Sequence, residues 1–120
     1  MVFFSNERGD DHWDIALSNG PGNKQTLARD VRLPIRSVPA LSPDGQWVAY
    51  GTATPEDSSI IYMTRVDNAN QTITIETGLV AAGEPALIEA GGRVMLAFTA
   101  LPSAGADWRQ LHIMDITNQL

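Results

Sequence analysis

Apolar residues occur along this chain in short runs that alternate with clusters of turn-forming residues. Valine, isoleucine, threonine and aromatic residues dominate the runs, a composition typical of β-strands. Glycine, proline, asparagine and aspartate fill the clusters between them, as at Ser42–Gly45 and Asp67–Asn70. In the middle of the chain this pattern predicts four strands, over about residues 38–42, 46–53, 59–66 and 72–78.

No segment shows a sustained helical period of apolar residues. The best candidate for a helix is the alanine-rich stretch over 80–92, but it contains Pro85, Gly83, Gly91 and Gly92. Proline and glycine both destabilise the interior of a helix. The sequence therefore predicts an all-β chain.

Two stretches of the chain resemble each other. Pro39-Ala40-Leu41 recurs 46 residues later as Pro85-Ala86-Leu87, and Ala49-Tyr50 recurs 48 residues later as Ala97-Phe98. The difference implies about two inserted residues in the second turn. We expect Pro39 and Pro85 to start equivalent inner strands.

The same period reaches both ends of the chain. Phe3-Phe4-Ser5 falls 46 residues before Ala49-Tyr50-Gly51. Three alternating apolar pairs mark the third strand of each unit, and each pair shares one face because side chains alternate along a strand. These pairs are Ile15/Leu17, Ile61/Met63 and Leu111/Ile113, with Ala16, Tyr62 and His112 facing the opposite way.

A unit of about 46 residues with four antiparallel strands is typical of a β-propeller blade. We interpret residues 1–120 as one propeller segment with blades over about 1–32, 36–80 and 83–120. The first and last blades are incomplete, so we expect three, four and three strands. Three blades cannot close a ring, which needs four to eight. We favour a fragment of a larger propeller over one part of an assembly; closure needs further blades from the same gene or another chain.

Residues 39–50 carry a resemblance to a known family. The run containing Ser42, Pro43, Asp44 and Gly45 and ending in Val48-Ala49-Tyr50 resembles the repeat of TolB-like (PD40, WD40-like) β-propellers. Residues 2–17 and 111–115 are similar to later parts of that repeat. The third unit departs from it, with Ile88-Glu89-Ala90-Gly91 in place of Ser-Pro-Asp-Gly. The resemblance implies protein–protein interaction, in a periplasmic or other extracytoplasmic location.

The Ser-Pro-Asp-Gly turn also has a direct physical interpretation. Pro43 fixes φ for the second position of a turn, and Asp44 can accept hydrogen bonds from nearby backbone N–H groups. Gly45 tolerates a positive φ. We therefore expect these residues to have a structural role.

Composition and charge exclude several function classes. The chain has 14 acidic and 8 basic residues, a net charge of −6, and no basic stripe, which disfavours nucleic-acid binding. No apolar run approaches the roughly 20 residues that span a bilayer, and no signal peptide is visible. The absence of cysteine excludes disulfides, thiol catalysis and cysteine-bound zinc.

Few residues are candidates for chemistry. Asp10, Asp11, His12 and Asp14 could hold a cation, but no calcium-loop spacing is present, and we expect a solvated loop. His112 could be a general base, yet it occupies a packing position of the repeat. We expect the tryptophans at 13, 47 and 108 to pack between blades or at strand ends rather than line a groove. No Gly-x-Ser-x-Gly elbow occurs.

The sequence thus predicts no catalytic, cofactor-binding or metal-binding residue and no cofactor. Repeat surfaces usually bind proteins or peptides, so we expect a noncatalytic binding scaffold. One alternative is the gating propeller of a prolyl-oligopeptidase-like serine peptidase, and another is the sensor propeller of a regulator. Both stay open on the sequence alone.

Overall fold

The computed structural model of the chain describes residues 1–5, 14–18, 22–28, 39–51, 59–103 and 105–120. Within these ranges the regular structure consists of ten strands and one short 3-10 helix, with no α-helix. The alanine-rich stretch that could have been helical is instead the longest strand, β8 (Val80–Ala90). The all-β expectation is therefore confirmed for the described residues.

The strands form three antiparallel sheets of three, four and three strands, the numbers that the repeat predicts. The first sheet has the order β1 (Val2–Ser5), β2 (Asp14–Ser18), β3 (Lys24–Ala28). The second has the order β4 (Ala40–Leu41), β5 (Trp47–Tyr50), β6 (Ile60–Arg65), β7 (Thr72–Glu76). The third has the order β10 (Gln110–Asp115), β9 (Arg93–Leu101), β8, and the 3-10 helix η1 (Thr117–Gln119) follows it.

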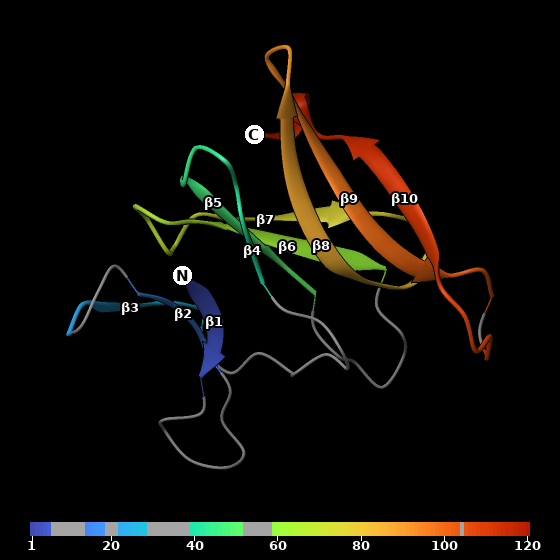
Figure 1. Cartoon of the computed structure of the whole chain (residues 1–120), viewed down its shortest axis with the longest axis horizontal. Coiled ribbons are helices and arrows are strands. Elements are labelled where there is room, and N and C mark those ends of the chain that lie inside the picture. Colours follow the sequence, from blue (N-terminus) through green and yellow to red (C-terminus); the bar gives the residue numbers. More distant parts are fainter. Residues whose placement is uncertain (6–13, 19–21, 29–38, 52–58, 104) are drawn as a thin grey trace.

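The three sheets follow one another in space as they do along the chain (Figure 1). Between the first and second sheets, β2 and β3 bury Ile15, Leu17 and Leu27 against Val48 and Tyr50. Between the second and third sheets, the side chains of β6 and β7 pack on β8 and β9; Ile61, Met63, Ile75, Leu96 and Phe98 form this core. In each interface, the face that carries Leu17 or Met63 packs against the face of the next sheet that carries Tyr50 or Phe98.

Strand pairing is repeated between the second and third sheets. Ala40 pairs with Ala49 in the second sheet, and Ala86 pairs with Ala97 in the third. On the other side of the same strands, Ala49 pairs with Met63 and Ala97 pairs with Ile113. The repeated sequence therefore corresponds to a repeated register, strand by strand.

The proposed match of the N-terminal segment to the repeat is wrong by one residue. Phe3 pairs with Ala16. In the second sheet, Tyr62 is the residue that the repeat aligns with Ala16, and its partner is Tyr50. Phe3 therefore corresponds to Tyr50 and not to Ala49. This register places Val2 and Phe4 on the buried face of the first sheet. Because residues 2, 3 and 4 are all apolar, their pattern does not distinguish the two registers.

The expectation that Pro85 starts its strand is also wrong. β8 begins at Val80 and contains two β-bulges, between Val80 and Gly83 and between Gly83 and Ala86. Pro85 lies within the second bulge, a place where a strand tolerates proline. Only the segment after it pairs regularly and corresponds to β4, which directly follows Pro39.

Candidate functional site

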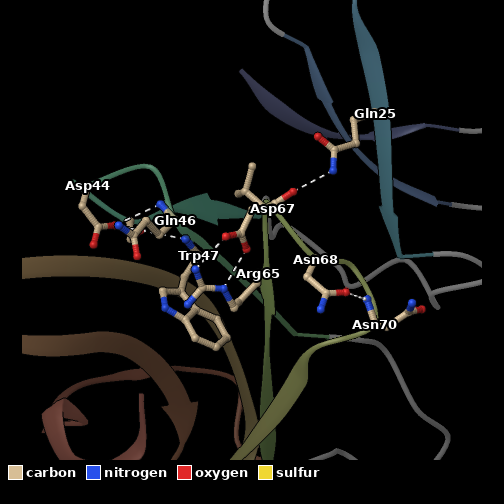
Figure 2. Close-up of polar contacts among 10 residues, drawn as sticks. Gln25, Asp44, Gln46, Trp47, Arg65, Asp67, Asn68 and Asn70 are labelled. Carbon is tan, nitrogen blue, oxygen red and sulfur yellow. Dashed lines mark hydrogen bonds and ion pairs between the residues drawn. The ribbon is translucent and has the colours of Figure 1, made fainter.

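A group of described polar side chains that contact one another lies at one end of the strands of the second sheet. The β4–β5 turn (residues 42–46) and the segment 65–71 at the β6–β7 turn lie together there (Figure 2). In an antiparallel sheet of this order, both turns fall at the same ends of the strands. We call residues 42–46 and 65–71 the turn edge.

The β4–β5 turn is held by hydrogen bonds among its own residues. The Ser42 hydroxyl donates to the Asp44 carboxylate at 2.6 Å and accepts from the Trp47 N–H at 3.0 Å. The Gln46 N–H donates to the same Asp44 oxygen at 3.0 Å. Gly45 adopts a φ of 74°, a conformation that strongly favours glycine. The four residues of the Ser-Pro-Asp-Gly repeat therefore build the turn.

These contacts also determine the charge and accessibility of the turn. The hydrogen bond from Ser42, and then that from the Gln46 N–H, lower the pKa of Asp44, so its carboxylate is ionised at neutral pH. Ser42 is buried, and its hydroxyl is occupied by Asp44 and Trp47. It is therefore not positioned to act as a nucleophile.

Arg65 joins the β6–β7 turn to Trp47, the first residue of β5. Its Nε and one terminal nitrogen donate to the two oxygens of Asp67, at 2.7 and 2.8 Å. The guanidinium carbon lies over the Trp47 ring, 5.5 Å from its centroid, a cation–π contact. The bond from Arg65 lowers the pKa of Asp67. Trp47 itself belongs to the core between the second and third sheets, so it packs between sheets as expected.

A further contact joins the turn edge to the first sheet. The Gln25 amide on β3 donates to the Val66 carbonyl at 2.7 Å (Figure 2). In the β6–β7 turn, the Asn68 side chain accepts from the Asn70 N–H at 3.2 Å. The first and second sheets therefore share a polar contact here as well as an apolar core.

The exposed groups of the turn edge are mainly hydrogen-bond acceptors and amides. Those on the surface are Asp44, Gln46, Asp67, Asn68, Asn70 and Gln71. Ionised carboxylates and amide oxygens suit a partner that offers cationic side chains or N–H groups. The turn edge can therefore bind such a partner without any covalent chemistry.

The remaining candidate residues lie elsewhere. His112 stacks on Phe98 with ring centroids 5.6 Å apart, consistent with the packing position that the repeat assigns to it. Asp14 is buried in β2, opposite Ser5, so the expectation of a solvated loop is wrong for this residue. The expectation that Trp108 packs against the sheets is wrong, because this side chain is exposed on the connection between β9 and β10. The structure does not describe Asp10, Asp11, His12 or Trp13.

Two of the turn-edge contacts were not anticipated from the sequence. The Arg65–Asp67 pair has a local signal, because opposite charges two residues apart at the end of a strand can meet in a turn. The bond from Gln25 to Val66 joins residues 41 positions apart, and its partner is a backbone carbonyl. No local pattern could have indicated it.

Other kinds of site are not found in the described part of the chain. No group of three or more metal-ligating side chains occurs among these residues. Within the same ranges, no helix has the length and apolar character needed to cross a membrane. A shallow hollow at the β8–β9 turn is lined by Glu89, Ala90, Gly91, Gly92 and Val94 and contains no basic or nucleophilic side chain.

The chain was compared with family models, with curated proteins and with solved structures. No family model, curated protein or solved structure matches it.

Proposed function

We propose that this chain is a noncatalytic binding scaffold, built as part of a TolB-like β-propeller, that binds a protein or peptide at its turn edge. The observation that carries the proposal is the repeated register. Ala49 pairs with Ala40 on one side and Met63 on the other, and Ala97 pairs in the same way with Ala86 and Ile113. Successive sheets also pack in the same order of faces, the arrangement expected of neighbouring blades. Such a stack holds its turns as a fixed rim.

The turn edge carries two aspartates, Asp44 and Asp67, against one arginine, Arg65, which pairs with Asp67, and the remaining negative charge supports a basic partner. Asp44 and Asp67 both have pKa values below the usual value for aspartate, because each accepts hydrogen bonds. The chain as a whole has a net charge of −6, which attracts cationic segments over a range of about 8–10 Å at physiological salt. A basic peptide with free N–H groups fits this chemistry.

Selection from a displayed library of random peptides on the 120-residue chain tests the proposal. We expect basic peptides to be enriched, and Asp67→Lys to weaken their binding at least tenfold. Asp107→Lys is the matched control, because Asp107 is an exposed carboxylate on the β9–β10 connection, away from the turn edge. Equal loss with both variants, no enrichment of basic peptides, or cleavage of the selected peptides by the chain would contradict the proposal.

A further inference from the structure

The outer face of the third sheet presents apolar side chains to solvent. Leu111 and Ile113 lie on this face of β10 and are 69% and 60% exposed. Ile88 on β8 is 44% exposed, and pairing places it in the same row as Met95. We call the face formed by Leu111, Ile113, Ile88, Met95, Ala86 and Ala97 the outer face.

Ion pairs lie at both ends of the outer face. Arg93 donates to Asp115 at 2.5 Å at one end, and Arg109 lies 3.1 Å from Glu84 at the other. An apolar centre with a charged rim is the usual anatomy of a protein–protein interface. Single exposed apolar residues need no explanation, but here the exposed side chains of β8 and β10 flank half-buried Met95 on β9, and such a contiguous apolar face marks an interaction surface.

The equivalent faces of the other two sheets are covered. Register assigns Ile113 to the position of Met63, and Met63 is fully buried beneath the third sheet. Leu17 occupies this position in the first sheet and is buried against Val48 and Tyr50. The outer face therefore corresponds to two surfaces that are covered within the chain. Each of these is covered by the face of the following sheet that carries Tyr50 or Phe98.

The chain also carries part of a third copy of the covering surface, since the first sheet has no described strand that corresponds to β4 and β8. Tyr50 and Phe98, at equivalent positions in β5 and β9, are buried by the preceding sheet. Phe3 has the same position in β1, but the first sheet has no described sheet before it (Figure 1), and Phe3 is only half-buried. Met1, next along this face, is 81% exposed.

We infer that the outer face binds a second copy of this chain, head to tail, by packing on the Phe3 side of the partner's first sheet. This interface would repeat the central part of the two sheet–sheet interfaces within the chain, the part formed by the strands that all three sheets share. Because it joins two different surfaces, it closes a ring or continues as a chain of subunits, depending on the rotation between copies. The inference rests on the stacking of the sheets and not on peptide binding at the turn edge.

Light scattering coupled to size-exclusion chromatography tests the association. We expect the chain to exceed its monomer mass of 13.0 kDa as concentration rises. The double variant Leu111→Lys/Ile113→Lys should associate at least tenfold more weakly, with an unchanged circular dichroism spectrum. Leu120→Lys, which changes an exposed apolar residue beyond η1, should associate like the parent chain. A 13.0 kDa monomer at every concentration would overturn the inference and point to another occupant, such as a further sheet of a longer polypeptide.

Disulfide trapping tests the head-to-tail arrangement, because the chain has no cysteine of its own. A mixture of Ile113→Cys and Phe3→Cys chains should give a mixed disulfide under mild oxidation, while Ile113→Cys alone should stay reduced. If Phe3→Cys fails to fold, Met1→Cys after an added initiator methionine replaces it. A disulfide between two Ile113→Cys chains would show that two outer faces pack together and would overturn the arrangement. Peptide binding by the lysine double variant is a separate readout, so the two proposals can fail independently.

Discussion

Phe98 and His112 stack directly across β9 and β10, with ring centroids 5.6 Å apart and ring planes 21° from parallel. Tyr50 and Tyr62 stack in the same way across β5 and β6, at 5.6 Å and 18°. The repeat therefore preserves a ring-on-ring contact although both residue types change. This conservation of geometry gives His112 a structural role, since an aromatic pair contributes about 0.5–1.5 kcal/mol beyond its buried area.

Removing this ring contact should reduce stability. We expect His112→Ala to lower the free energy of unfolding by about 1 kcal/mol, whereas His112→Tyr, which copies Tyr62, should keep it. Urea denaturation followed by circular dichroism measures both. Gln110→Ala, on an exposed position of the same strand, is the control. An unchanged midpoint for His112→Ala would show that the stacking adds nothing.

The β4–β5 turn should be sensitive to a side chain at Gly45. Its φ of 74° is unfavourable for a β-branched residue, so we expect Gly45→Val to destabilise the chain by about 1–3 kcal/mol. Gln46→Val, one residue later and exposed, should cost much less because it keeps its N–H bond to Asp44. Equal denaturation midpoints for the two variants would contradict the prediction.

Asp115 should titrate far below the usual range of an aspartate. The Thr117 hydroxyl, then the Thr117 N–H and Arg93, lower the pKa of Asp115 from 3.8 to about 2. A pKa that is lowered on folding stabilises the folded chain above the unfolded pKa of 3.8. This contribution is lost as pH falls from about 4 toward 2.

Carbon-detected NMR of the side-chain carboxylates measures that titration. Thr117→Val removes the hydroxyl but keeps the N–H, so we expect the pKa of Asp115 to rise toward 3.8. Asn118→Ala changes a neighbouring exposed residue and should leave the titration unchanged. A midpoint near 3.8 in the parent chain would show that these hydrogen bonds do not form.

The first bulge of β8 places Ala81 at a φ of 52°, where a residue with a Cβ atom is strained. Glycine relieves a strain of about 1–2 kcal/mol there but adds about 0.5–1 kcal/mol of chain entropy to the unfolded state. We therefore expect Ala81→Gly to raise the melting temperature slightly. Ala86→Gly, in the regular part of β8, should lower it. A loss of stability with Ala81→Gly would mean that the bulge does not carry this strain.

Close packing between the second and third sheets should make Gly51 hard to replace. A Cβ atom at Gly51 would lie 3.2 Å from the Ala82 carbonyl oxygen and 3.4 Å from the Gly83 Cα. Because both neighbours are backbone atoms, we expect Gly51→Ala to cost about 1–3 kcal/mol. Gly83→Ala is the matched control, since its Cβ would meet only the end of Arg109, at 3.6 Å. Thermal melts that do not separate the two variants would count against tight packing at this point.

The sequence alone determined the strand content and the division into three sheets of three, four and three strands. These features depend on neighbouring residues, because β-branched and aromatic runs favour strands wherever turn formers bound them. Pro43, Asp44 and Gly45 specify their turn in the same local way, through a fixed φ, hydrogen-bond acceptors and a permitted positive φ. The repeated Pro-Ala-Leu segment also indicated which strands are equivalent.

Only the tertiary structure decided how those strands are aligned and which faces they expose. The apolar run Val2–Phe4 fits two registers equally well, and packing of Ile15 and Leu17 against Val48 and Tyr50 selects one of them. The Gln25–Val66 contact likewise depends on how two sheets meet. Ile113 and Met63 follow the same pattern in sequence, yet one is mostly exposed and the other fully buried. Burial depends on what lies opposite a face in space, and that information is not contained in the alternation of residues along a strand.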